Sequence, residues 1–316
     1  MNKESQKYEE ILNVFKSSWS NQLTLPEVQI VESQDSRTVK FAMSELRNFS
    51  NFEIVKAWRN LERSDSKSWE STSVSIKRRK WIHMSEIEFP RGEDPRLFKH
   101  QNEVYAMVQK FNEDLADISI TLINMTSGER TDLISPLGFN GKNWVPISVQ
   151  NDLYFAYSLD PVVIQKLDAK TQRLELLNKI ENFAPKWDHD LEKSIGLIRG
   201  GTPALYQSDV QSAVGFSHSI NPEIDLHAHR MGVYLLNFST RELKHVYLTN
   251  YFPGLLVDSY GLQEVSGHFV VDGTMALGDI HEQDSRILNF RFRFSKREVL
   301  DLLCNVLPLS EEAATK

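Results

Sequence analysis

Asp152-Leu153-Tyr154-Phe155-Ala156-Tyr157 is a short run of aromatic and aliphatic residues that opens with a polar turn residue. Runs of this kind, separated by Gly, Pro, Asn, Asp or Ser, are typical of β-strands. Four similar runs occur, and successive ones begin about 50 to 60 residues apart, the length of a four-stranded sheet with its turns. This interval predicts an all-β fold, a five-bladed β-propeller; the alternative, a pair of β-sandwiches, needs no regular interval. The other runs are Phe52–Trp58, Glu103–Val108, Ser212–His218 and Thr274–Gly278.

Two helices are expected at the ends of the chain. Apolar residues recur with a spacing near 3.6 over residues 4–19, which indicates an amphipathic helix. Ser295 is a suitable N-cap for a second helix, which ends before Pro308. The expected organisation is a helix and lead-in over 1–26, the propeller over 27–294, and a helix and tail over 295–316.

The amino-acid composition of the chain limits the kinds of partner that we expect the protein to bind. Of the 316 residues, 41% are hydrophobic and 25% charged, which is typical of a globular protein with an ample core. The net charge of −7 argues against a nucleic-acid or anionic-membrane partner. Cys304 is the single cysteine, so neither a disulfide framework nor a cysteine zinc site is expected. No signal peptide and no apolar run long enough for a membrane span are recognisable, so we expect a cytoplasmic protein, with oligomerisation left open.

The segment Glu93-Asp94-Pro95-Arg96 is the strongest candidate for chemistry. Pro95 fixes its own φ and favours extended geometry at Asp94, which would hold one acid beside the cation of Arg96. Asp94 is therefore a candidate catalytic acid. The alternative is a turn that carries only a surface ion pair.

Further polar residues lie in segments around the third and fourth runs, and a radial arrangement of sheets would bring such loops to one mouth. Carboxylate, amide, guanidinium and aromatic groups together suit a carbohydrate site, where rings stack on sugars and an acid protonates the glycosidic oxygen. Each of these residues also has a simpler explanation. Trp144 and His218 could be core residues, and the glycines beside Arg199 could merely permit a positive φ in a turn. The segments are Gly141–Trp144, Arg199–Pro203, Ser217–Ser219 and Asp225–Arg230, the last entering a strand that contains Tyr234.

Metal binding is not expected. His227 and His229 alternate along a predicted strand and so share a face, but no Cys or Glu-His motif accompanies them.

These motifs resemble those of the five-bladed propeller carbohydrate-active proteins, in particular the β-mannoside phosphorylases and hydrolases of glycoside hydrolase family 130 and the related β-1,2-mannosyltransferases. The resemblance covers roughly residues 45 to 290 and is most specific at Glu93–Arg96. It implies that Asp94 acts on the glycosidic oxygen through a hydroxyl of a bound mannose. It also implies that basic and polar residues surround an anion, and the counterparts here are Lys142, Asn143, Arg199, His218, His229 and Tyr234.

The expected function is therefore transfer of a mannosyl-type group, as a glycosyltransferase or glycoside phosphorylase acting on an oligosaccharide or glycan. Inorganic phosphate, a sugar phosphate or a nucleotide sugar is the expected co-substrate, and no cofactor is expected. Glu93 and Arg96 are assigned to substrate binding, with Arg96 orienting Asp94, and Trp144 or Tyr154 offers a stacking face. A hydrolase would need a second carboxylate, for which Asp225 and Glu264 are the candidates. The alternatives are an inverting glycoside hydrolase and a non-catalytic glycan-binding propeller.

Overall fold

The computed structural model describes residues 3–31, 38–48, 52–62, 72–80, 83–111, 118–137, 142–177, 198–221, 225–278 and 286–308. This part of the chain contains 21 strands and two helices. The all-β class is confirmed, and so are the two expected terminal helices, α1 (Lys3–Ser18) and α2 (Lys296–Cys304). Ser295 caps α2 as predicted, because its side chain accepts a hydrogen bond from the backbone N–H of Glu298.

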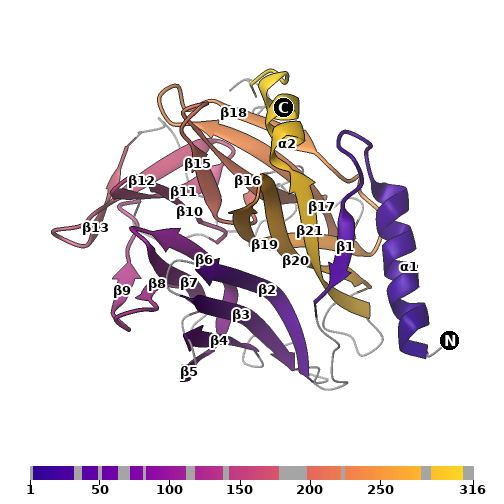
Figure 1. Ribbon diagram of the computed structural model, residues 1–316, viewed down its shortest axis with the longest axis horizontal. Coiled ribbons are helices and arrows are strands. Elements are labelled where there is room, and N and C mark those ends of the chain that lie inside the picture. Colours follow the sequence, from indigo (N-terminus) through magenta and orange to yellow (C-terminus); the bar gives the residue numbers. More distant parts are fainter. Residues whose placement is uncertain are drawn as a thin grey trace.

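The strands form five antiparallel groups, which we call units 1 to 5 in chain order. In Figure 1, β2, β6, β10 and β19 lie toward the middle of the molecule, and β5, β9, β13 and β18 lie toward its rim. Unit 1 contains β2 (Thr38–Asn48), β3 (Glu53–Glu62), β4 (Thr72–Lys80) and β5 (His83–Pro90). Unit 2 contains β6 (Gly92–His100), β7 (Glu103–Phe111), β8 (Ile118–Asn124) and β9 (Arg130–Leu133).

Unit 3 contains β10 (Val145–Val149), β11 (Asp152–Leu159), β12 (Val162–Asp168) and β13 (Arg173–Leu176). Unit 4 contains β15 (Ala204–Gln207), β16 (Ser212–Asn221), β17 (Asp225–Asn237) and β18 (Leu243–Tyr247), with the short β14 (Arg199–Gly200) paired to β16. Unit 5 contains β19 (Leu255–Val265), β20 (His268–Leu277), β21 (Arg286–Ser295) and, as its outermost strand, β1 (Glu27–Ile30).

Hydrogen bonding joins two of the units. A parallel pair between β10 and β15, in which Ile147 lies opposite Ala204, connects units 3 and 4 into one nine-stranded sheet. The described strands therefore form four sheets rather than five separate ones, and five units are obtained only when the large sheet is divided at this parallel pair. Unit 5 draws its fourth strand from the start of the chain, because β1 pairs with β21.

The five repeated runs found in the sequence occupy equivalent places. They lie in β3, β7, β11, β16 and β20, each of which is the second strand from the middle in its unit. Such a strand has a neighbour on both sides and is covered on both faces, so apolar residues fill it more continuously than they fill the rim strands. The repeat was visible because this environment recurs in every unit.

Five clusters of buried hydrophobic side chains fill the spaces between neighbouring units. One cluster joins units 1 and 2, and others join units 2 and 3, units 3 and 4, and units 4 and 5. The last joins unit 5 back to unit 1, through Leu256 and Tyr260 on one side and Phe41 and Leu61 on the other. Each unit therefore packs on two neighbours, and the arrangement closes on itself.

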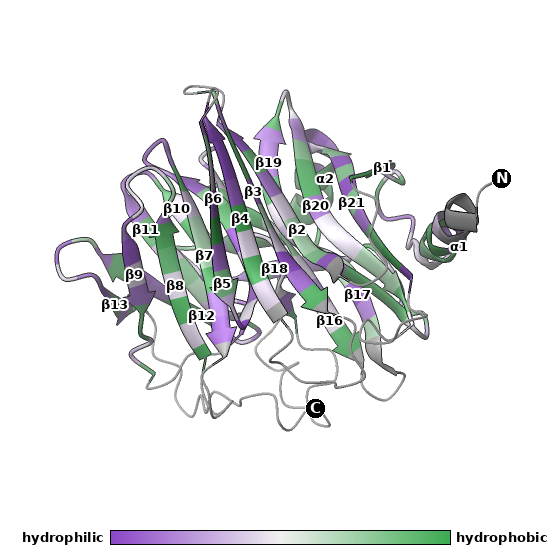
Figure 2. Cartoon of the chain, turned by 90° about the horizontal axis from the view of Figure 1, so that it is seen from below, coloured by the Kyte–Doolittle hydropathy of each residue, from purple (hydrophilic) through white to green (hydrophobic). Residues whose placement is uncertain are grey.

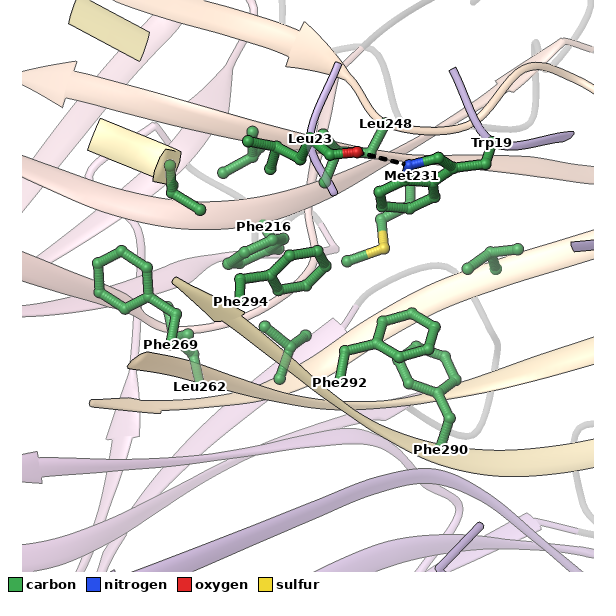
Figure 3. Close-up of a cluster of buried hydrophobic side chains, with 14 of the residues drawn as sticks. Trp19, Leu23, Phe216, Met231, Leu248, Leu262, Phe269, Phe290, Phe292 and Phe294 are labelled. Carbon is green, nitrogen blue, oxygen red and sulfur yellow. Dashed lines mark hydrogen bonds between the residues drawn. The ribbon is translucent and has the colours of Figure 1, made fainter. Parts of the chain in front are cut away.

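Helix α1 belongs to the core between units 4 and 5. It lies at the edge of the molecule beside β21 (Figures 1 and 2). Phe15 stacks on Phe292 with ring centroids 5.1 Å apart, and Trp19 stacks on Phe294 at 6.2 Å. Figure 3 shows Trp19, Phe292 and Phe294 together with Phe216 of unit 4, and the Trp19 Nε1 group donating a hydrogen bond to the Leu23 carbonyl. Across the described residues, no helix is both long and apolar enough to cross a membrane.

We predict that Phe15→Ala lowers the free energy of unfolding by about 3–5 kcal/mol, because it removes a fully buried ring and leaves a cavity between α1 and β21. Phe52→Ala is the matched control, since Phe52 is 65% exposed and its loss should change stability by only about 0.5 kcal/mol. Denaturant titration of both variants measures the difference. Equal midpoints for Phe15→Ala and the wild type would show that α1 is not part of the core.

Candidate functional site

Asp94 lies at a β-bulge in β6. The register between β6 and β7 shifts between Glu93 and Arg96, and Asp94 has a φ of +42°. The expectation of extended geometry at Asp94 is therefore wrong, because the bulge forces the left-handed region in spite of the proline that follows. Aspartate tolerates this region better than most residues.

The bulge is a repeated backbone feature of the inner strands. In β2 the register shifts after Phe41, where Ala42 has a φ of +54°, and in β19 it shifts between Ser259 and Gly261. The side chains at the three bulges differ: alanine in unit 1, Asp94 in unit 2 and Tyr260 in unit 5. The register shifts at all three places, but a positive φ occurs at Ala42 and Asp94 and not at Tyr260; units 2 and 5 place ionisable side chains there.

Two carboxylates next to each other in β6 meet cations from other units. Glu93 is buried and forms ion pairs with Arg59 Nη2 of β3 at 2.5 Å and with Lys142 Nζ at 2.7 Å. Asp94 Oδ1 lies 3.7 Å from Arg59 Nη1, and the side chain of Asp94 keeps 13% of its surface exposed. Glu93 is therefore held by two cations, while Asp94 is the acid that solvent or a substrate can reach.

Arg96 links three units through a fully buried guanidinium group. Its Nε donates to the Gly201 carbonyl at 2.8 Å, and its Nη2 donates to the Gly200 carbonyl at 2.9 Å and to Asn143 Oδ1 at 3.2 Å. Its Nη1 donates to the backbone carbonyl of Asp94 at 3.2 Å. Arg96 thus positions Asp94 through the backbone, and the cation nearest to the Asp94 carboxylate is Arg59.

The two glycines after Arg199 are required by close packing. A Cβ atom on Gly200 would lie 2.3 Å from the Asn143 carbonyl oxygen, and one on Gly201 would lie 2.8 Å from the Phe216 carbonyl oxygen. Neither glycine has a positive φ, so the interpretation that they merely permit that conformation is wrong. The small size of Gly200 lets β14 approach Asn143 beside unit 3, and that of Gly201 lets the next residue approach Phe216 and Ser259, so both carbonyl groups reach Arg96.

A second group of polar residues gathers between units 4 and 5. His229 Nδ1 lies 2.8 Å from Asp258 Oδ1, and His218 Nδ1 lies 4.0 Å from the same oxygen. The two imidazole rings are nearly parallel, with an interplanar angle of 6° and centroids 5.4 Å apart. The Tyr260 hydroxyl donates to Asp258 Oδ2 at 3.1 Å.

Electrostatics connects the two groups. Burial lowers the pKa of His218 to about 3, and Asp258 opposes this shift while His229, Arg199 and Arg96 add to it. Burial, Asp258 and Asp94 all raise the pKa of Tyr260 well above its ordinary value. Burial raises the pKa of Asp258, but the two histidines and Tyr260 outweigh burial, so this carboxyl is ionised at neutral pH. The Tyr260 hydroxyl thus contacts Asp258, and the pKa of Tyr260 also responds to the charge of Asp94. We call the whole set the central cluster: Arg59, Glu93, Asp94, Arg96, Lys142, Asn143, Arg199, His218, His229, Asp258 and Tyr260.

Most residues predicted from the sequence converge there, and three aromatic residues do not serve as expected. Trp144 is fully buried against Phe155 and Tyr157, so it has no face for a sugar. Tyr234 is also fully buried, and its hydroxyl points at Gly215. The ring of Tyr154 packs on Phe238, which follows β17 of unit 4. The Tyr154 hydroxyl donates a hydrogen bond to Asp152 within unit 3. We therefore correct the assignment of Trp144 and Tyr154 as stacking faces and that of Tyr234 as a residue near the bound anion.

The two candidates for a second carboxylate have different outcomes. Glu264 forms an ion pair with Lys296 at 3.0 Å, beside the start of α2 and away from the central cluster. The side chains of Asp225 and His227 lie outside the described residues.

Sequence reasoning missed Arg59, Asp258 and Tyr260. Arg59 directly follows the first repeated run, Phe52–Trp58, and its charge is the one signal that marks it. Asp258 and Tyr260 precede the last repeated run, and their alternate spacing at Asp258-Ser259-Tyr260 suggested no motif. These residues lie far apart in the sequence and are brought together only because units 1, 2 and 5 meet in the folded chain.

Behind the cluster, on the opposite face of β16 and β17, Ser217 Oγ lies 2.8 Å from His245 Nε2. A Cβ on Gly232 would lie 2.4 Å from that nitrogen, so the pair is enclosed by backbone. Both side chains are buried, so this is a packing contact inside unit 4.

Comparison with known proteins shows which solved structures share this fold. No protein-family model matches the chain, and no curated protein matches it in sequence. A hypothetical protein from Leishmania major is 13% identical, with a TM-score of 0.55 over 90% of this chain and 94% of that one. The β-1,2-mannobiose phosphorylase from Listeria innocua is 12% identical, with a TM-score of 0.52 over 86% and 95%. Zg3597, a family 117 glycoside hydrolase from Zobellia galactanivorans, is 10% identical, with a TM-score of 0.50 over 87% and 91%. The structural neighbours thus include propeller-fold carbohydrate-active enzymes, and at these identities the likeness is one of fold.

We predict that Arg96→Met lowers the free energy of unfolding by about 3–5 kcal/mol, because three backbone carbonyls and one side-chain amide lose a buried charged partner. Arg96→Lys should recover less than half of the loss, since an ammonium group cannot reproduce the planar fork. Arg297→Met, at a side chain that is 91% exposed, is the control. Denaturant midpoints that are the same for Arg96→Met and Arg297→Met would contradict the linking role.

We predict a pH effect at His245. Burial lowers its pKa from the ordinary 6.5 to about 3, so between these values the unfolded state binds a proton that the folded state does not. Stability therefore falls as the pH drops below 6.5. His245→Asn should flatten this dependence by up to about 1.4 kcal/mol per pH unit. Unfolding titrations between these pH limits measure the slopes, and a wild-type slope in His245→Asn would refute the prediction.

Proposed function

We propose that this protein is a carbohydrate-active enzyme that transfers a mannosyl-type group between a glycan and phosphate, with Asp94 as the proton carrier. The observation that carries the proposal is the setting of Asp94. It is a partly exposed carboxylate on a strand bulge, 3.7 Å from Arg59 of unit 1, and the adjacent Glu93 is paired with Arg59 and Lys142. The structural neighbours that include a mannobiose phosphorylase support the choice of chemistry.

In the proposed reaction, phosphate attacks the anomeric carbon and the glycosidic C–O bond breaks in the same displacement. The Asp94 carboxyl supplies a proton to the leaving oxygen, by way of a sugar hydroxyl. A sugar phosphate and a free sugar hydroxyl are the products, and the reverse reaction is glycosyl transfer from the sugar phosphate. One acid is sufficient because phosphate is already an anion, so no second carboxylate is needed to activate it as the nucleophile.

Arg199 and Lys142 are the proposed partners of the phosphate. Arg199 lies opposite His218 across the β14–β16 pair, and Lys142 keeps 21% of its side chain exposed while it contacts Glu93. Their charges can draw an anion into a site that already holds Arg59 and Arg96. His218 is neutral at physiological pH, so it would offer an N–H donor without a positive charge.

The second candidate is inverting hydrolysis, and Asp258 is the observation that favours it. A hydrolase needs a base whose carboxyl lies roughly 6.5–9.5 Å from the acid. Asp258 is a further carboxylate of the central cluster, and its charge and that of Asp94 both raise the pKa of Tyr260. However, Asp258 is buried, and His229 and Tyr260 contact its two oxygens. A buried carboxylate whose two oxygens already accept hydrogen bonds is a poor general base for a water molecule. We therefore prefer phosphate as the nucleophile.

We predict that Asp94→Asn lowers kcat by about 10²–10⁴-fold with little change in Tm, because it removes the proton while keeping the side-chain shape. The assay is a panel of β-linked manno-oligosaccharides with and without phosphate, sugar phosphates and nucleotide sugars. Asp209→Asn, in an exposed turn, is the matched control. Turnover at the wild-type rate in Asp94→Asn would refute the role of Asp94.

Product analysis with wild type and Asp258→Asn separates the alternatives. Phosphorolysis yields a sugar phosphate only when phosphate is present, whereas hydrolysis yields free sugar without it and is lost in Asp258→Asn. Sugar binding without any product, unaffected by Asp94→Asn, would indicate a glycan-binding protein instead.

A further inference from the structure

We propose that His218, His229 and Asp258 form a binding site for a divalent transition-metal ion, with Zn²⁺ the best match. The three side chains come from β16, β17 and β19, so two units supply the ligands. Their ligand atoms all lie within 4.8 Å of one another. The proposal is independent of the glycosyl-transfer function, because metal binding is measured without substrate.

His218 is the residue that points to a ligand. Its side chain is only 6% exposed, and its Nδ1 has no hydrogen-bond partner among the described residues. That nitrogen lies 4.0 Å from Asp258 Oδ1, which is too long for a hydrogen bond. A buried polar atom without a partner is unfavourable, and a cation held between the imidazole and the carboxylate would satisfy it.

The surroundings of the three side chains suit a metal. The Tyr260 hydroxyl holds the second oxygen of Asp258, as hydrogen-bonding partners commonly hold metal-binding carboxylates. To admit an ion, the 4.0 Å separation between His218 Nδ1 and Asp258 Oδ1 must shorten, because Zn–N and Zn–O bonds are only about 2.0–2.2 Å long.

The donor set decides the class of ion. Two imidazoles and one carboxylate favour Zn²⁺ and related transition metals over Ca²⁺ or Mg²⁺, which prefer oxygen ligands. His229 is 17% exposed, so one side of the site is open to water or a substrate. Arg96 and Arg199 face His218 and oppose a cation, so the affinity should be lower than that of structural zinc sites.

The test is metal binding by the full chain after treatment with a chelator. We expect one equivalent of Zn²⁺ per chain in a competition titration, and Co²⁺ should give the visible absorption of a coordinated ion. His229→Gln and Asp258→Asn should each weaken binding by at least about tenfold, and Tyr260→Phe should weaken it by about tenfold through loss of the supporting hydrogen bond. His83→Gln, at an exposed position, is the control.

Thermal melts establish that each variant is folded before titration. If Asp258→Asn is unfolded, His229→Gln and Tyr260→Phe decide the question, since His229 is partly exposed and Tyr260→Phe keeps the ring. The absence of stoichiometric binding at millimolar metal would overturn the proposal. Binding that is equal in wild type, His229→Gln and Tyr260→Phe would overturn it too, because the ion would then lie elsewhere.

Discussion

The buried guanidinium group of Arg96 is the interaction on which the arrangement of the site depends. Removing a charge from water is unfavourable by several kcal/mol, and the cost is offset only when every donor finds a well-placed acceptor. The acceptors here are carbonyls of β6 and β14 and the Asn143 amide, so units 2, 3 and 4 must be positioned together. Gly200 and Gly201 make this possible because no side chain separates the strands.

The same constraint defines the chemistry of the middle of the molecule. Arg96 satisfies backbone groups, which leaves Arg59 and Lys142 for the carboxylates of β6. Glu93 takes most of that charge and is buried, whereas Asp94 remains partly exposed. On the other side, burial makes His218 a neutral group between Arg199 and Asp258. The cluster therefore combines a reachable acid, fixed cations and an uncharged imidazole in one place.

The sequence predicted features that rest on local patterns. The repeated runs identified the second strand of each unit, because those strands share one environment, and Ser295 marked the start of α2 through its capping preference. The sequence did not predict long-range features. The pairing of β1 with β21 and of β10 with β15 joins segments that carry no mutual signal. The conformation of Asp94 was missed because the bulge outweighs the local effect of Pro95, and Asp258 was missed because its histidine partners lie on other strands.

A crystal structure of the protein grown with phosphate and mannose tests the central claim most directly, since it locates both ligands at once. The account predicts the anion against Arg199 and Lys142, with a sugar hydroxyl within hydrogen-bond distance of the Asp94 carboxylate. An anion bound only elsewhere, such as in the rim groove lined by Arg47, Arg291 and Arg293, with no sugar near Asp94, would contradict it.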